Sequence, residues 1–406
     1  MKILFVSLGC DKNLVDSEKM LGMLQEKGYT FTDDEAEADV VVVNTCCFIG
    51  DAKEESINTL LQMGELKDSG QVKALIAAGC LAQRYREEIQ KEIPQVDAII
   101  GTTAIDEIVA ALEEILAGQK QNHYEDINAA PVTETNRVVT TGGHFAYLKI
   151  AEGCDKHCTY CIIPKVRGNY RSVPKESLLK EARELADKGV RELILVAQET
   201  TLYGVDLYGK KELPGLLHEL AQIPGIYWIR ILYCYPEEIT DELIDAIAAE
   251  PKVCNYLDIP IQHINDEILR KMNRRGNGEY VRQLFTKLRH EIPGLVLRTS
   301  LITGLPGEGE EEFEQLCDFL KEYKLERVGA FAFSPEEGTR AAEMEYPDTE
   351  ISKQRAEQVA EIQSRIMDDY NESCVGQVMQ VLCEGYDPDE DSYYGRTYAD
   401  SPDIDG

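Results

Sequence analysis

Three cysteines lie close together in the stretch "EGCDKHCTYCIIPKVRG", at Cys154, Cys158 and Cys161. Their C-x3-C-x2-C spacing is typical of metal-binding thiolates, but zinc sites and iron–sulfur clusters normally take four protein ligands. His157 lies in the same loop and could complete a Cys3His zinc site. Alternatively, a cluster held by three thiolates leaves one iron open to an external molecule. An open position is what distinguishes catalytic from structural metal sites.

A second set of three cysteines is spread along the N-terminal part of the chain, at Cys10, Cys46 and Cys80. Each follows an apolar run that predicts a β-strand: "KILFVS", "VVVVN" and "ALIAA". The carboxyl ends of parallel strands share one sheet edge, where open α/β sheets bind ligands, so we expect these cysteines to meet. A single one could be a small hydrophobic core residue, but three at equivalent strand ends favour an iron–sulfur cluster over zinc. Cys47 adjoins Cys46 and competes with it as a ligand.

The strands and helices that must position Cys10, Cys46 and Cys80 are predicted from apolar runs that alternate with amphipathic stretches. Residues 1–118 hold continuously apolar runs separated by helical patterns, which is typical of a parallel sheet covered on both faces. We therefore predict a small, doubly wound α/β domain there. Residues 119–143 are polar and lack periodicity, which indicates a linker.

From residue 144 the alternation resumes, and residues 144–370 are predicted to form a second α/β domain that ends in a charged helix. Six strands are too few for a complete eight-stranded barrel, so we predict a partial (β/α)6 barrel. Residues 371–406 begin a short β pattern that we interpret as the start of a small β-barrel. The six strand candidates are "FAYLKIA", "RELILVA", "YWIRILY", "NYLDIP", "LVLRTSLIT" and "RVGAFAF".

Charge limits the partners of this chain. The 406 residues include 42 Lys and Arg against 74 Asp and Glu, a formal net charge of −32. Such a protein repels nucleic acid unless a local basic stripe overrides its field, and it attracts a basic protein. Residues 383–406 contain eight acidic residues and one arginine, although such a run can also be a solvated loop.

The cellular compartment is predicted from what the sequence holds at its start and from its cysteines. The opening "MKILFVSLGC" has too few apolar residues for a signal peptide, and no apolar run approaches the ~20 residues of a membrane span. We expect a cytoplasmic protein that does not enter a membrane. Its 12 cysteines should then stay reduced, so clustered ones indicate metal or redox chemistry rather than disulfides.

The C-x3-C-x2-C motif, with Tyr160 before its last cysteine, resembles the radical S-adenosylmethionine superfamily. The resemblance narrows to the methylthiotransferases and covers nearly the whole chain. It implies an N-terminal cluster domain, a radical barrel and a C-terminal TRAM domain, which is OB-like. TRAM domains of this family run further than Gly406, so we expect part of one here. The stretches that carry the resemblance are "SLGC", "VNTC", "AAGCLAQRY", "CTYCIIPKVRG", "LYCYPEEIT", "DIPIQH", "ITGLPGE" and "FSPEEGT".

The cofactors implied by this resemblance are S-adenosylmethionine and two [4Fe-4S] clusters. The motif "NTC" favours Cys46 over Cys47 as a ligand of the N-terminal cluster. Arg167, beside the cluster of the C-x3-C-x2-C motif, could hold a carboxylate or pair with a nearby glutamate. No catalytic residue is predicted beyond the clusters. The implied cluster ligands are Cys10, Cys46, Cys80, Cys154, Cys158 and Cys161, and the residues expected to bind S-adenosylmethionine are Tyr160, Gln198, Glu199 and Gly304.

The substrate is predicted from the branch of the family that the sequence resembles. The opening "SLGCDKNLVDSE" is similar to the branch that adds a methylthio group to an aspartate β-carbon of a small-subunit ribosomal protein, protein twelve. The acidic C-terminal segment suits a basic protein and would repel RNA, so nucleic acid is not expected as the substrate. A low-potential electron donor such as flavodoxin is the second expected partner. The alternatives are methylthiolation of adenosine in tRNA and a non-catalytic iron–sulfur electron carrier.

Overall fold

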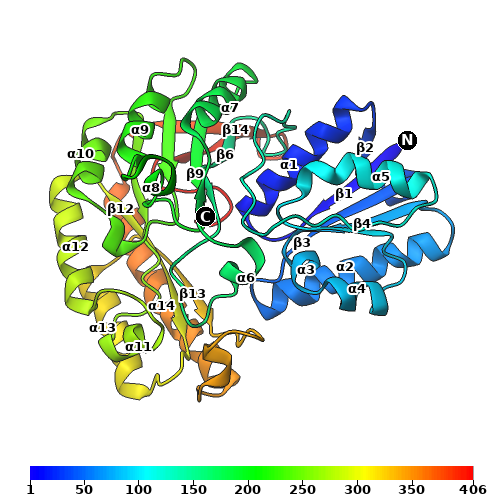
Figure 1. The fold of residues 1–406 in the computed structure, drawn as a ribbon. Helices are drawn as coiled ribbons and strands as arrows, with labels where there is room; N and C mark the ends of the chain where they lie inside the picture. Colours follow the sequence, from blue (N-terminus) through cyan, green and yellow to red (C-terminus); the bar gives the residue numbers. More distant parts are fainter. Residues whose placement is uncertain (406) are drawn as a thin grey trace. The chain divides into compact units, whose positions relative to one another are not determined.

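The computed structural model describes residues 1–405, and Gly406, the last residue of the predicted TRAM segment, lies outside the described residues. The described chain forms two compact units, which are shown in Figure 1 and treated separately below. Unit 1 comprises residues 1–140, 151–155 and 161–173, and unit 2 comprises residues 141–150, 156–160 and the chain from residue 174 onward. The predicted domain boundaries at residues 118, 143 and 370 stay predictions.

Unit 1 is built on a five-stranded parallel sheet in the order β2-β1-β3-β4-β5. This confirms the doubly wound sheet that the apolar runs predict; the short edge strand β2 was not expected. The strands are β1 (Lys2–Ser7), β2 (Thr30–Thr32), β3 (Val40–Thr45), β4 (Ala74–Ala78) and β5 (Ala98–Ile100), and the helices are α1 (Asp11–Glu26), α2 (Gly50–Asp68), α3 (Gly79–Arg84), α4 (Arg86–Glu92) and α5 (Ile108–Leu116).

Both faces of this sheet are buried, which explains why its strands are apolar at every position. On β3, Val40 and Val42 pack in one cluster with residues of α1 and α5, while Val41 and Val43 pack in another with residues of α2, α3 and α4. The helices accordingly cover opposite faces of the sheet in Figure 1. Side chains of a strand alternate between the faces, so a central strand between two helical layers needs a continuous apolar run.

Later segments of the chain also belong to unit 1. The predicted linker forms no regular helix or strand between residues 118 and 143, apart from an isolated bridge of His123 with Ile100. It is nevertheless fixed to α1, because Arg137 donates to Glu18 with Nε–Oε2 at 2.7 Å. Strands β7 (Ala151–Glu152) and β8 (Arg171–Ser172) pair antiparallel around α6 (Ile163–Arg167).

Unit 2 contains a six-stranded parallel sheet in the order β13-β12-β11-β10-β9-β6. Every one of the six predicted strands is present, which confirms the partial barrel. The strands are β6 (Phe145–Lys149), β9 (Glu192–Val196), β10 (Trp228–Ile231), β11 (Val253–Asp258), β12 (Val296–Thr303) and β13 (Arg327–Ala332). The helices are α7 (Lys175–Asp187), α8 (Val205–Tyr208), α9 (Leu213–Ala221), α10 (Asp241–Ala249), α11 (Asp266–Lys271), α12 (Gly278–Glu291), α13 (Glu310–Tyr323) and α14 (Thr349–Cys374).

The chain after α14 forms an antiparallel hairpin of β14 (Val381–Asp387) and β15 (Ser392–Thr397), the predicted start of a β-barrel. The segment after the hairpin contacts residues near the amino-terminal ends of the barrel strands. Arg298 on β12 donates from Nε to Asp405 Oδ1 at 3.2 Å, and Arg327 on β13 donates to Asp400 at 2.5 Å. The opposite, carboxyl edge of the barrel sheet thus carries the loops that hold the candidate site. Within residues 1–405, no helix is both long enough and apolar enough to cross a membrane.

Candidate functional site

The loop that carries Cys10 packs directly against Cys46. Strand β1 ends at Ser7, and Cys10 stands immediately before the first residue of α1. Gly9 adopts φ +88°, and a Cβ atom at Gly9 would lie 2.6 Å from Cys46 Cβ and 2.8 Å from Cys46 Sγ. Only glycine tolerates both that backbone conformation and that approach. The two predicted ligands are therefore held side by side by a residue between the strand and the first cysteine.

Two buried hydroxyl groups fix the backbone around Cys46 and Cys80. Ser56 on α2 accepts a hydrogen bond from Cys46 N and donates to Cys46 O, both at 2.9 Å. Thr45 donates to Ala78 O at 2.6 Å and accepts from Ala82 N at 3.2 Å, which ties the end of β3 to the first turn of α3, where Cys80 lies. The sequence reasoning missed both hydroxyl residues.

Asn13 joins the strand ends that carry the three cysteines. Its Nδ2 donates to Leu8 O at 2.9 Å and to Thr45 O at 3.0 Å, and its Oδ1 lies 3.9 Å from the Cys80 thiol, which donates to it. Asn13 is 1% exposed, so these backbone carbonyls would find no water in its absence. The available signal was positional: an asparagine in the first turn of a helix that begins right after Cys10 must face the same sheet edge.

The three thiols interact electrostatically, as the predicted convergence requires. Burial, together with the charges of Cys80 and Cys10, raises the pKa of Cys46 to about 12. Burial also raises the pKa of Cys80, while Arg167 lowers it. Thiolates that repel one another at one sheet edge would be relieved by iron between them, and metal binding would release their protons. As the side chains stand, no group of three or more His, Cys, Asp or Glu residues within residues 1–405 is arranged as a metal-ion site.

Cys47 has a different environment from Cys46. It is fully buried in the hydrophobic cluster that also contains Leu60 and Leu81. Its carbonyl accepts a hydrogen bond from Arg84 at 3.5 Å, and burial raises its pKa to about 12. Cys46, by contrast, packs against Gly9 in the loop that precedes Cys10. Cys80 belongs to the same cluster, and its charge raises the pKa of Cys47 as it raises that of Cys46, so the contact with Gly9 is the observation that favours Cys46 as the residue that faces the sheet edge.

Each part of the C-x3-C-x2-C loop is anchored by backbone hydrogen bonds within its own compact unit. In unit 1, Cys154 N donates to Gly168 O at 3.1 Å, and Cys161 lies just before α6. In unit 2, Thr159 N donates to Met272 O at 3.1 Å, and Thr159 O accepts from Ala341 N at 2.9 Å. The cysteines of this motif are partly exposed, and so differ from Cys46 and Cys80. His157, the alternative zinc ligand, is exposed with φ +49°.

Glu199 is a buried carboxylate at the carboxyl edge of the barrel sheet, beyond β9. Its Oε1 accepts from Thr201 N at 2.9 Å, and its Oε2 lies 3.6 Å from Lys156 Nζ. Burial raises the pKa of Glu199 to about 7, against the opposing effect of Lys156. Within the described residues, Oε2 has no hydrogen bond, so it fits the ammonium group of an external ligand. The predicted residue Gln198 is the preceding residue and is half-buried.

Tyr160 and Gly304 lie at the same barrel edge but are held by packing. Tyr160 packs against a cluster that includes Met272, Leu305 and Phe333. Gly304 adopts φ +77°, and a Cβ atom there would lie 1.8 Å from Ser352 Oγ on α14, so the approach of that helix explains the glycine. Their predicted contacts with S-adenosylmethionine stay predictions.

Glu308, which follows β12 and was expected at the barrel edge together with His263, holds the loop of Gly304 in place. Its Oε1 accepts from Gly304 N and from Arg355 Nη1, both at 2.9 Å, and its Oε2 lies 3.4 Å from His263 Nε2. Glu308 is 3% exposed and His263 is fully buried. No sequence pattern links Glu308 with Arg355 on α14, because only the fold brings them together.

Family models match three successive parts of the chain. Residues 2–101 match the family described as uncharacterized protein family UPF0004, residues 148–320 match the radical SAM superfamily, and residues 375–406 match the TRAM domain. The chain is thus a radical SAM protein with the domain order that the motifs predict.

Solved structures support the fold. The chain is similar to the radical S-adenosylmethionine methyltransferase TsrM of Kitasatospora setae, with a TM-score of 0.59 and 14% identity over 82% of this chain and 74% of that one. It is also similar to the cobalamin-dependent S-adenosylmethionine radical enzyme OxsB, with a TM-score of 0.55 and 12% identity over 97% of this chain and 64% of that one. At these identities the likeness concerns the fold alone.

Curated relatives are far more similar in sequence. The chain is 57% identical to the ribosomal protein uS12 methylthiotransferase RimO of Lachnoclostridium phytofermentans, over 100% of this chain and 92% of that protein. It is 48% identical to the protein of the same name from Acetivibrio thermocellus, over 100% of this chain and 91% of that one. The resemblance to the ribosomal-protein branch is confirmed, and the chain belongs to the RimO family of ribosomal protein uS12 methylthiotransferases.

Proposed function

We propose that this chain adds a methylthio group to the β-carbon of an aspartate in ribosomal protein uS12. The observation that carries the proposal is the 57% identity over the full chain to a ribosomal protein uS12 methylthiotransferase. The target C–H bond is not acidic, so no side-chain base removes its proton at a useful rate. A reaction at such a carbon therefore needs a cofactor for the difficult step.

We infer that Cys154, Cys158 and Cys161 hold one [4Fe-4S] cluster, and that S-adenosylmethionine binds at its open iron. When bound, these groups supply the one-electron chemistry that removes a hydrogen atom from an unactivated carbon. The match of residues 148–320 to the radical SAM superfamily supports this assignment. The protein supplies the three thiolate ligands, which are partly exposed.

We infer that Cys10, Cys46 and Cys80 hold a second [4Fe-4S] cluster. The support is that these thiols follow three neighbouring strands and influence one another's charge. A second cluster gives the reaction a place to keep sulfur, which S-adenosylmethionine cleavage alone does not provide.

Four residues of unit 2 are proposed to position S-adenosylmethionine. Glu199 would bind the methionine ammonium group through Oε2, the carboxylate oxygen that now lies 3.6 Å from Lys156. Tyr160 would line the adenine region from its apolar cluster. Gln198 and Gly304 stand on neighbouring loops of the same edge, and Glu308 fixes the Gly304 backbone at 2.9 Å.

The acidic hairpin is proposed to attract the basic substrate. Three of the eight acidic residues in the C-terminal segment are used inside unit 2: Glu384 pairs with Arg396, Asp400 with Arg327 and Asp405 with Arg298. The exposed charge is therefore concentrated in the hairpin turn, at Asp389, Glu390 and Asp391. A negative turn favours association with a basic protein and disfavours RNA. This refines the expectation that the whole segment serves as an acidic surface.

Because the substrate is a ribosomal protein, we infer that the enzyme acts in the cytoplasm with a low-potential electron donor such as flavodoxin. The decisive experiment incubates the reconstituted enzyme, S-adenosylmethionine, sulfide and a reductant with uS12 or with tRNA. Mass spectrometry should find one methylthio group on an aspartate of uS12 and unmodified tRNA. A modified adenosine together with unmodified uS12 would contradict the proposal.

A further inference from the structure

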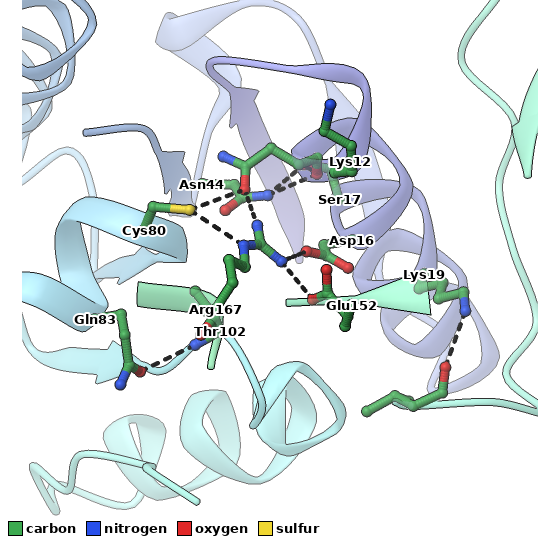
Figure 2. Close-up of polar contacts among 12 residues, drawn as sticks. Lys12, Asp16, Ser17, Lys19, Asn44, Cys80, Gln83, Thr102, Glu152 and Arg167 are labelled. Atoms are coloured by element: carbon green, nitrogen blue, oxygen red, sulfur yellow. Dashed lines mark hydrogen bonds and ion pairs between the residues drawn. The ribbon is translucent and has the colours of Figure 1, made fainter. Parts of the chain in front are cut away.

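Arg167 lies at the centre of a buried polar network in unit 1 (Figure 2). Its side chain is 2% exposed, and every nitrogen of the guanidinium has a partner. Nη1 donates to Asp16 Oδ2 at 2.7 Å and to Glu152 Oε2 at 2.8 Å, and Nη2 donates to Asn13 Oδ1 at 2.5 Å. The remaining nitrogen, Nε, donates to Cys80 Sγ at 3.3 Å. One cation therefore meets two carboxylates, an amide and a predicted cluster ligand.

The Asp16 and Glu152 carboxylates already satisfy the structural need of the arginine. A buried guanidinium is stabilised when opposite charges compensate it, and Arg167 is paired with both carboxylates. The hydrogen bond to Cys80 is not needed for that compensation. Sulfur is a weak acceptor as a thiol and a stronger one as a thiolate, which is the form that binds metal. The free thiol is accommodated too, because it donates to Asn13 Oδ1 at 3.9 Å, but the hydrogen bond from Arg167 becomes stronger when Cys80 is a thiolate bound to metal.

Arg167 is close in sequence to one cysteine set but contacts a cysteine of the other set. It follows Cys161, the last cysteine of the C-x3-C-x2-C motif, by one short helix, yet its Nε faces a cysteine of the other set. Segment 161–173 belongs to the same compact unit as Cys80, and Ile162 and Val166 pack in the hydrophobic cluster of that unit. The contact is therefore internal to one unit and is fixed on both sides.

We propose that Arg167 is a positioning residue for the iron–sulfur cluster at Cys10, Cys46 and Cys80, and that its hydrogen bond to Cys80 raises the reduction potential of that cluster. Hydrogen bonds to ligand sulfurs and nearby positive charge favour the reduced, more negative form of a cluster. Asp16 and Glu152 partly neutralise the positive charge of Arg167 and so limit its effect on the Cys80 sulfur. The inference rests on the proposed function, because it requires the second cluster.

The test uses the full chain with Cys154, Cys158 and Cys161 changed to Ala, so that only the N-terminal cluster can form. The protein is reconstituted with ferrous iron and sulfide, and the midpoint potential is followed by electron paramagnetic resonance. Arg167→Lys keeps a positive charge for Asp16 and Glu152 but loses the Nε–H donor, so we expect a more negative potential at unchanged iron content. Glu152→Gln keeps the shape and removes one negative charge, so we expect a shift in the opposite direction.

A matched control distinguishes cluster tuning from a general effect on folding. Arg137 pairs with Glu18, which is fully buried on the same helix α1, and its side chain is as buried as that of Arg167. Glu18 also accepts hydrogen bonds from Thr140 N at 2.6 Å and from Thr140 Oγ1 at 2.8 Å. Arg137→Lys should lower the stability of unit 1 and leave the midpoint potential unchanged.

Equal potentials in the parent, Arg167→Lys and Glu152→Gln proteins would overturn the role of Arg167 and leave the cluster itself in place. If Arg167→Lys fails to fold, Glu152→Gln decides alone, because its isosteric side chain keeps the arginine contact. If the parent protein binds no cluster, the ligand assignment of the proposed function is wrong, and the role of Arg167 falls with it. A loss of S-adenosylmethionine cleavage is not a readout here, since the parent already lacks that activity.

Discussion

The two cysteine sets of this molecule are built in opposite ways. Cys154, Cys158 and Cys161 come from one short loop, so the sequence alone brings them together. Cys10, Cys46 and Cys80 come from three neighbouring strands, and only the parallel sheet makes them neighbours. The dispersed set is supported by a shell of buried side chains, Asn13, Ser56 and Thr45 among them, whereas the loop is anchored through backbone hydrogen bonds of Thr159 and Cys154.

This difference teaches where each site is vulnerable. A local set depends on its own residues, because little else is needed to keep three cysteines of one loop together. A dispersed set depends on every contact that holds the strand ends in register, so residues far from sulfur control it. Shells of this kind orient metal ligands and are as important as the ligands themselves.

The largest expected effect separates Cys46 of the dispersed set from the adjacent Cys47. Cys46→Ala should lower bound iron from about eight to about four atoms per chain, because one of two four-iron clusters is lost. Cys47→Ala should keep about eight, since Cys47 packs in the apolar core. Iron and sulfide analysis of the reconstituted variants checks this. The reverse pattern would move the ligand by one residue, and zinc in place of iron would contradict both cluster assignments.

The next effect concerns the local set, whose open iron needs an external ligand. Glu199→Gln should reduce S-adenosylmethionine binding by at least tenfold, because the buried carboxylate that we propose to bind its ammonium group can no longer carry a charge. Equilibrium binding of S-adenosylmethionine to the reconstituted enzyme measures this. Glu242→Gln, on the exposed surface of α10, is the control and should bind normally. Undiminished binding in Glu199→Gln would remove this residue from the site.

The Glu199→Gln variant should also change how the stability of the cluster-free protein depends on pH. Burial raises the pKa of Glu199 from 4.5 to about 7, while Lys156 and Thr201 lower it and Glu238 raises it. The folded protein holds this proton more tightly than the unfolded chain, so the associated stability is complete below pH 4.5 and is lost as the pH rises through 7. Glu199→Gln lacks that loss and should gain up to about 3 kcal/mol over wild type between pH 4.5 and 8. Urea unfolding at both pH values measures the difference, and a constant difference would contradict the burial argument.

Sequence patterns predict the strands and the cysteine edge because both depend on local rules. Continuous apolar runs mark strands that are buried on two faces, and the residue after such a strand lies at the carboxyl edge whatever follows. The six barrel strands and the positions of Cys10, Cys46 and Cys80 follow from this rule. The same rule places Glu199 beyond β9, although its partner Lys156 lies in the cysteine loop.

The supporting contacts could not be predicted, because they join positions that no local pattern relates. Arg167 and Asp16 are 151 residues apart, and their ion pair depends on the β7–β8 segment belonging to unit 1. The same holds for the acidic C-terminal segment, in which Asp405 pairs with Arg298, 107 positions away. The number of acidic residues in the sequence therefore overstates the negative charge that a partner protein can contact. Composition reports how many charges there are, and only the fold reports which are already used.

A smaller effect tests whether support differs between the two sets. Asn13→Ala leaves the buried carbonyls of Leu8 and Thr45 without their donor and should lower the free energy of unfolding by about 2–4 kcal/mol. Asn273 supports the cysteine loop in a similar way, by donating to His157 O at 3.0 Å, but at an exposed position. Asn273→Ala should therefore cost about 1–2 kcal/mol, most of which is the strain of alanine at the φ of +55° that Asn273 adopts. Chemical denaturation of both variants gives the comparison, and equal costs would refute the idea that the dispersed set depends more on its surroundings.

The smallest effect concerns the substrate rather than the clusters. Asp389→Asn combined with Glu390→Gln removes two exposed charges from the hairpin turn and should raise the KM for uS12 by roughly threefold at low salt, with an unchanged kcat. The increase should vanish at high ionic strength, because interactions between exposed charges are screened within about 10 Å at 0.1 M salt. The matched control, Glu242→Gln with Asp245→Asn, removes two exposed charges from α10 and should not change the KM. If both pairs raise the KM equally, the overall charge of −32 attracts the substrate and the hairpin has no special part in docking.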